Sequence, residues 1–139
     1  MTPSDYFNIS LLALCVWREA RGEPVEGKVA VACSIRNRVA YPSWWGRDWH
    51  TVILKPRQYS SFNADDPNAT KWPDEHEAAW QSCLEIADAV YTEVTADTTG
   101  GADSYYDISI PPPAWAMPER HTIDVGKLKF YRLRPQSPS

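Results

Sequence analysis

The sequence predicts an α+β protein that is mainly helical, with a small β element near its C-terminus. Apolar residues recur at helical spacing up to about residue 95, and an alternating apolar pattern follows only in KLKFYRL at 127–133. The chain has 139 residues, of which 43% are hydrophobic, so it is the size of one globular domain with a core. We therefore expect a single domain over 1–139, with a core from about 5 to 133 and a frayed tail at 134–139.

Two helices are expected in the first 40 residues. The first begins at Ser4 or Asp5, either of which can cap it, and ends before Gly22. The second covers about 25–39 and stops before Pro42, because the residue before a proline disfavours helical geometry.

A third helix is expected over 73–95, where Pro73 suits the first turn and the apolar residues, Val94 included, are three or four apart. Residues 95–103 are predicted to form a loop, and PPPAW at 111–115 an extended segment or turn. The tail at 127–133 is expected to form a strand or hairpin.

Composition and charge indicate which binding partners are expected. The net charge is −4, and acidic residues greatly outnumber basic ones between Asp65 and Asp107, so nucleic acid is not expected as a partner. The five basic residues from Arg120 to Arg134 are expected to form only a solvated face. The histidines are scattered and lack metal-ligand spacing, so neither a metal nor another cofactor is expected.

The cysteines and the first apolar run bear on location. Cys15, Cys33 and Cys83 fall inside apolar helical patterns and are expected to be buried and reduced. The run from Ile9 to Trp17 is too short to span a membrane and has no preceding basic segment. We expect synthesis in the cytoplasm without a signal peptide.

Glu19 lies near the expected C-terminus of the first helix, where the helix dipole disfavours a carboxylate. It continues the stripe formed by Leu12, Cys15 and Val16, so it should be at least partly buried. Burial and the dipole should both raise its pKa, which suits a general acid. The alternative is a structural salt bridge to Arg18, Arg21 or Arg38.

Four ordered blocks carry a family resemblance. REARGEPVEGKVAVACSIRNRV at 18–39, KPRQYSSFN at 55–63, GGADSYYDISIPPPAWA at 100–116 and TIDVGKLKFYR at 122–132 resemble the SleB-like cell wall hydrolases. This family contains spore cortex-lytic enzymes and related phage and bacterial peptidoglycan hydrolases. The blocks cover most of residues 10–132.

The resemblance implies a lysozyme-like, lytic transglycosylase-like fold. It implies cleavage of the MurNAc–GlcNAc bond of bacterial peptidoglycan by a lytic transglycosylase or muramidase, with Glu19 as the catalytic acid. One acid suffices for a transglycosylase because the 6-hydroxyl of muramic acid attacks C1. Glu23, Asp103 and Asp107 are candidates for a second carboxylate but are expected to be structural or solvated.

Two of the resembling blocks contain the residues expected to bind substrate. The amide and hydroxyl groups of Gln58, Tyr59 and Ser60 suit hydrogen bonds to the glycan. Tyr105, Tyr106 and Trp115 are candidates for a cleft wall. Trp44, Trp45 and Trp49, in an expected loop, could stack on sugars but are expected mainly to pack in the core.

The expected setting follows from the same features. A small wall hydrolase without a signal peptide resembles a phage or prophage endolysin, which would reach the wall through a holin. A monomer is expected. The alternative is a noncatalytic peptidoglycan-binding module, in which the cleft persists without the chemistry.

Overall fold

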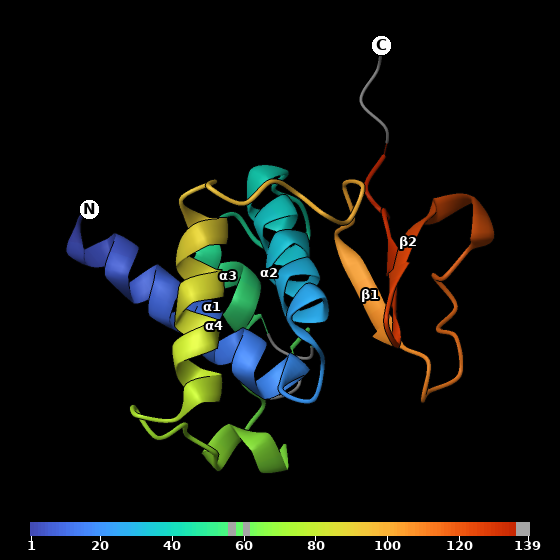
Figure 1. The fold of residues 1–139 in the computed structure, drawn as a ribbon. Coiled ribbons are helices and arrows are strands. Elements are labelled where there is room, and N and C mark those ends of the chain that lie inside the picture. The colour runs from blue at the N-terminus through green and yellow to red at the C-terminus, as the bar shows by residue number, and fades with distance from the viewer. Residues whose placement is uncertain (56–57, 60–61, 136–139) are drawn as a thin grey trace.

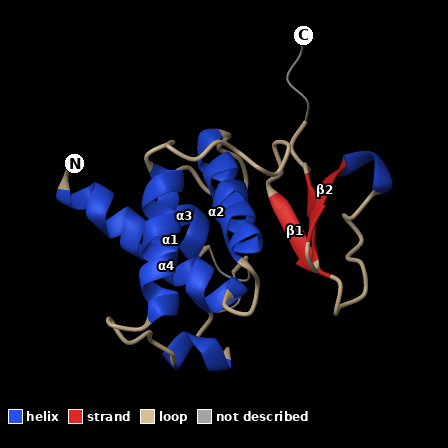
Figure 2. Ribbon diagram, in the orientation of Figure 1, coloured by secondary structure: helices blue, strands red, loops and turns tan. Residues whose placement is uncertain are grey.

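The computed structural model describes residues 1–55, 58–59 and 62–135 and consists of a helical part beside a small sheet. Figures 1 and 2 show the α-helices gathered on one side and the strands on the other, where a short 3-10 helix at Pro118–Arg120 leads into β2. The helices are α1 (Pro3–Ala20), α2 (Val25–Ala40), α3 (Trp49–Leu54) and α4 (Ala78–Tyr91), and the strands are β1 (Ser104–Asp107), β2 (His121–Val125) and β3 (Leu128–Tyr131). The predicted α+β class is confirmed.

Helix α1 begins earlier than expected. Thr2, not Ser4 or Asp5, is the N-cap, and Asp5 is the acidic partner of a capping box that Thr2 completes. The side chain of Asp5 also accepts a hydrogen bond from the Tyr91 hydroxyl at 2.5 Å, which ties α1 to the end of α4. Helix α2 ends one residue beyond the predicted boundary, at Ala40.

Helix α4 is shorter than the predicted 73–95. Residues 73–77 lie outside the helix and include a turn at 75–76, where the Asp74 side chain accepts a hydrogen bond from the His76 amide at 2.8 Å. At the other end, Glu93 adopts a positive φ of 62°, which is incompatible with a continuing helix. Val94, expected on the apolar face, is therefore 82% exposed.

Helix α3 was not expected, because the segment after α2 was predicted to be a loop. Asp48 caps it and forms a capping box with Thr51. Gly46, just before it, has a φ of 128°, and a Cβ there would lie 2.9 Å from the Val52 amide nitrogen. The chain therefore makes a tight turn before α3.

The strands form an antiparallel sheet in the order β1-β3-β2. The predicted strand at 127–133 is confirmed as β3, which pairs with β2 as a hairpin around Gly126 and with β1 through pairs such as Tyr105 with Phe130. The predicted loop at 95–103 and the irregular segment at 111–115 are also observed.

The core lies between the helices and extends to the sheet. Helix α2 contacts the other helices and also β1 and β2, so it joins the two parts (Figure 1). The three cysteines are buried and unpaired, as predicted. Other fully buried residues include Leu12, Val16, Val31, Ile35, Val90 and Phe130.

Arg134, the first residue of the tail that is expected to fray, lies among the described residues. Arg134 is held by the loop before β1, where its Nη1 donates to the Gly101 carbonyl oxygen at 2.8 Å. Residues 136–139 lie outside the described part. No helix among the described residues combines the length and the apolar character needed to cross a bilayer.

Candidate active site

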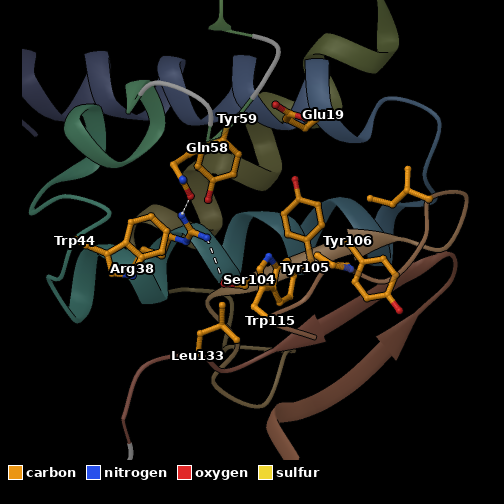
Figure 3. Close-up of a pocket in the computed structure, with 12 residues that line it drawn as sticks. Glu19, Arg38, Trp44, Gln58, Tyr59, Ser104, Tyr105, Tyr106, Trp115 and Leu133 are labelled. Atoms are coloured by element: carbon orange, nitrogen blue, oxygen red, sulfur yellow. Dashed lines mark hydrogen bonds between the residues drawn. The ribbon is translucent and has the colours of Figure 1, made fainter. Parts of the chain in front are cut away.

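A cleft of about 550 Å³ lies between the helical part and the sheet. Helix α1 contributes its last turn, α2 its C-terminal half and β1 its first three residues, and the segment before β2 covers one side (Figure 3). The described residues that line it are Glu19, Arg38, Trp44, Gln58, Tyr59, Ser104, Tyr105, Tyr106, Ile110, Pro113, Trp115 and Leu133.

Glu19 lies in the last turn of α1 and is partly buried, as the helical stripe predicts. The stripe residues Leu12, Cys15 and Val16 are fully buried beneath it. Its carboxylate lies on the same side of the cleft as Tyr59, opposite the Tyr105 hydroxyl (Figure 3). Its role as the acid stays a prediction.

The arginines that were considered as structural partners of Glu19 have other contacts. Arg18 donates to the Lys71 carbonyl oxygen from Nη2 at 3.0 Å. Its guanidinium also lies 4.7 Å from the centre of the Trp72 ring. Arg21 lies over the ring of Trp17 at 4.3 Å. Arg18 therefore holds the segment around Lys71 and Trp72 against α1, whereas Arg21 packs on a ring of α1 itself.

Arg38 is a buried cation in the wall of the cleft. Its Nε donates to the Asp103 carbonyl oxygen at 2.5 Å, its Nη1 to Gln58 Oε1 at 2.9 Å and its Nη2 to Ser104 Oγ at 3.3 Å (Figure 3). The fork of guanidinium donors thus joins α2, the Gln58 loop and β1. The Gln58 side-chain oxygen accepts a hydrogen bond from Arg38. The side-chain NH2 group of Gln58 is therefore the part left to donate to a ligand.

Aromatic rings form the other wall. Tyr106 packs edge-on against Trp115 with ring centres 6.1 Å apart, and both contact the ring of Tyr131. Trp44 is 57% exposed and lies over Arg38 at 5.8 Å. The structure therefore places Tyr105, Tyr106 and Trp115 on the cleft, as predicted, while sugar binding by them stays a prediction.

The tyrosine hydroxyls beside Glu19 keep their protons. Burial raises the pKa of Tyr59 far above its ordinary value. Burial, and then the negative charge of Glu19, raise the pKa of Tyr105 well above its ordinary value. Both phenols are therefore neutral hydrogen-bond donors at physiological pH.

The other candidate carboxylates lie outside the cleft lining. Asp103 is 1% exposed and accepts hydrogen bonds from the Leu133 amide at 2.9 Å and the Arg134 amide at 3.1 Å, so it is structural, as expected. Asp107 accepts from the Ser109 amide at 2.8 Å. Glu19 is thus the only carboxylate among the described lining residues. The residues of the 55–63 block outside the described part, Pro56, Arg57, Ser60 and Ser61, include no acid.

The tryptophans after α2 separate into two groups. Trp45 is 1% exposed and donates from Nε1 to the Arg38 carbonyl oxygen at 2.9 Å, and Trp49 packs on Tyr91, so the expectation of core packing is confirmed for these two. Trp44 instead lines the cleft.

Two further expectations concern Ser60 and a metal site. Ser60, predicted to bind substrate, lies outside the described residues. In the part of the chain that the structure describes, no group of three His, Cys, Asp or Glu residues is placed to hold a metal.

Sequence reasoning missed Arg38 and Ser104 as cleft residues. Arg38 was predicted only as a possible salt-bridge partner of Glu19, and no local sequence pattern indicates its place in the cleft wall. Ser104 precedes the two tyrosines that were singled out, and alternation along a strand places it on the same face as Tyr106.

The sequence pattern of the cell wall hydrolase family matches residues 22–131, which is most of the chain. The chain belongs to this family. The match begins at residue 22, three residues after Glu19, and does not test the role predicted for Glu19.

Curated relatives agree with this family. The chain is 30% identical over 130 residues to a spore cortex-lytic enzyme of Halalkalibacterium halodurans, and the match covers 92% of this chain and 36% of that protein. A spore cortex-lytic enzyme of Oceanobacillus iheyensis is 28% identical over 88% of this chain and 41% of that protein. The chain therefore spans about two fifths or less of the length of these relatives.

Solved structures of the catalytic domains of SleB proteins show the same fold. The catalytic domain of the germination-specific lytic transglycosylase SleB from Bacillus anthracis superposes with a TM-score of 0.69 at 28% identity, over 95% of this chain and 97% of that one. The catalytic domain of the Bacillus cereus SleB protein gives the same TM-score and identity, over 95% and 93%. The predicted lysozyme-like, lytic transglycosylase-like fold is confirmed.

Proposed function

We propose that this chain cleaves the MurNAc–GlcNAc bond of peptidoglycan as a lytic transglycosylase, with Glu19 as the one general acid and base. The observation that carries the proposal is that Glu19 is the only carboxylate among the described residues lining the cleft. A hydrolytic muramidase of the usual two-carboxylate type needs a second acid on the opposite face of the sugar. The Bacillus anthracis neighbour is a lytic transglycosylase, which supports the same reaction.

In the proposed reaction Glu19 gives up one proton and takes up another. The Glu19 carboxylic acid protonates the glycosidic oxygen, and the bond from C1 of MurNAc to that oxygen breaks. The 6-hydroxyl oxygen of the same MurNAc then bonds to C1 and loses its proton to the Glu19 carboxylate. The products are a GlcNAc hydroxyl and a 1,6-anhydro-MurNAc end, with no water consumed and Glu19 protonated again.

The surroundings of Glu19 support proton donation. Its partly buried position at a helix C-terminus favours the neutral form of a carboxyl group. The neutral hydroxyl of Tyr105, from the opposite wall, is suited to hydrogen-bond a sugar next to the acid. Holding the acid and the sugar in position before the reaction contributes much of the rate in such sites.

The cleft walls suit a glycan chain. Trp115 and the exposed Trp44 offer apolar ring faces for sugar rings, and Trp44 is the ring with most free surface. The NH2 group of Gln58, oriented by Arg38, is placed to bind an acetamido or hydroxyl oxygen. Ser60, from the same block, is kept as a predicted contact on the resemblance alone.

Two variants test the assignment of Glu19. Glu19→Gln keeps the shape of the side chain but has no proton to donate, so the rate of muropeptide release from purified walls should fall about 10²- to 10⁴-fold. Glu23→Gln is the matched control, since Glu23 is four residues away and outside the cleft lining, and should retain the wild-type rate.

Equal rates for the two variants would contradict the role of Glu19. If the wild type binds walls and releases no muropeptide, the chain is the noncatalytic binding module instead. The assay should use both vegetative walls and spore cortex as substrates. An endolysin, the setting expected from the sequence, should act on vegetative walls, whereas the names of the curated relatives favour spore cortex.

A further inference from the structure

A second hollow, of about 390 Å³, lies where β2 begins and β3 ends, and it is lined mainly by basic side chains. We call it the basic pocket and define it by Arg120, His121, Thr122, Arg132 and Arg134, with Glu119 as the acidic member of the lining. Three of the five basic residues that were expected to form a solvated face therefore line a concave site.

Two of its arginines are fixed by the backbone. Arg120 donates from Nη1 to the Leu133 carbonyl oxygen at 2.9 Å. Arg134 donates from Nη1 to the Gly101 carbonyl oxygen at 2.8 Å and pairs with Asp103 at 3.2 Å. The Arg134 side chain is only 9% exposed, so its guanidinium is held in one position.

The pocket leaves arginine donors unused. Among the described residues, no acceptor pairs with the side chain of Arg132, and the buried Nε atoms of Arg132 and Arg134 have no hydrogen-bond partner. By contrast, Arg36 donates to the carbonyl oxygens of Val90 and Thr95 at 2.9 and 2.8 Å. A buried donor without an acceptor costs free energy, so these two nitrogens are donors for which the described part of the fold offers no acceptor.

The charge of the pocket selects an anion. Three arginines face one exposed acid on the lining, Glu119, and Asp103 compensates only part of the charge of Arg134. The planar fork of a guanidinium matches the two oxygens of a carboxylate. The pocket is therefore suited to a small anionic group on a larger ligand.

The basic pocket adjoins the cleft along the chain. Leu133 lines the cleft, whereas its neighbours Arg132 and Arg134 line the basic pocket, so the two hollows are separated by one backbone segment. A four-residue peptide reaches about 13 Å when extended, which is long enough to pass around a single segment. Peptide stems project from the muramic acid residues of a peptidoglycan strand and carry free carboxylates.

We propose that the basic pocket binds a carboxylate of the peptide stem while the glycan strand occupies the cleft. This inference rests on the proposed function for its ligand. It assigns recognition of the peptide to Arg132 together with Arg120 and Arg134, and so makes the enzyme selective for walls whose stems are not amidated.

The test is a titration of the whole chain with the free stem tetrapeptide. Binding is monitored through the NMR signals of the arginine side chains. The wild type should show saturable shifts at Arg120, Arg132 and Arg134, and the fully amidated tetrapeptide should not produce them. Arg132→Gln should weaken binding about tenfold, because it removes hydrogen bonds to a charged group. Lys127→Gln, which makes the same charge change on an exposed residue outside the pocket, should bind as the wild type does.

The proposal is overturned if the wild type shows no saturable shifts, if the amidated peptide binds equally well, or if both variants behave alike. Inorganic phosphate is the third ligand to titrate: stronger shifts of the same signals by phosphate than by the peptide would make this a phosphate site and overturn the proposal. The titration involves no turnover. A chain that binds the tetrapeptide but cleaves no wall would refute the proposed function alone, and cleavage without peptide binding would refute this inference alone.

Discussion

At the scale of single residues, Arg38 organises the cleft although it is not expected to take part in proton transfer. Its three hydrogen bonds reach Gln58 and, at the start of β1, the Asp103 carbonyl and Ser104, so they join two distant parts of the chain to α2. A buried guanidinium at 7% exposure needs these acceptors to offset the loss of water. The positions of Gln58 and Ser104 therefore depend on it.

Arg38→Lys tests this role. Lysine keeps the charge but lacks the planar fork, so it cannot satisfy all three acceptors. The free energy of unfolding should fall by about 1 to 3 kcal/mol, measured by urea denaturation. Arg47→Lys, at an exposed position, is the control, and equal stability of the two variants would show that the Arg38 bonds contribute nothing.

At the scale of elements, the loop between α4 and β1 determines where the strand meets α2. Asp97 accepts hydrogen bonds from the Thr99 amide at 2.8 Å, the Gly101 amide at 2.8 Å and Asn37 Nδ2 at 3.2 Å. Burial opposes its charge, but the bonds from Thr99, Asn37 and Gly101 outweigh burial and lower the pKa of Asp97 below its ordinary 3.8.

Asp97→Asn should therefore give a pH-dependent loss of stability. Because the pKa is lower in the folded state, the stabilisation is fully present above the ordinary pKa of 3.8 and is lost as the pH falls below it. The loss should be about 1 kcal/mol at pH 7, since the side chain is partly screened by solvent, and should shrink toward pH 3. Denaturation curves at the two pH values measure it. Asp65→Asn is the exposed control, and a loss that does not change with pH would contradict the linkage.

Hydrophobic periodicity predicted the long elements, whereas local backbone and capping features determine the short helix α3 and the end of α4. The buried stripe of α1 and the alternation of β3 are strong patterns, so both elements could be predicted. Helix α3 is only six residues long, and its Asp48–Thr51 capping box is too short a signal to distinguish from a turn. The early end of α4 follows from the left-handed conformation of Glu93, which residue type alone does not indicate.

At the scale of the whole molecule, the cleft could be predicted only in part. The resemblance and the helical stripe both selected Glu19, and the structure places it in one cleft with Gln58, Tyr59, Tyr105, Tyr106 and Trp115. Arg38 and Trp44 reach the same cleft through tertiary contacts that no local pattern encodes. The basic pocket was missed for the same reason, because a sparse basic segment becomes concave only when the chain around Gly100 packs against it.

The central claim at this scale is that one carboxylate and a hydroxyl of the substrate are sufficient for cleavage. Digestion of purified walls in water labelled with heavy oxygen, followed by mass spectrometry of the muropeptides, tests it most directly. A transglycosylase consumes no water, so we predict anhydro-MurNAc ends that lack the label. Reducing MurNAc ends that carry the label would contradict the claim, because a water activated by another group would then have attacked the sugar.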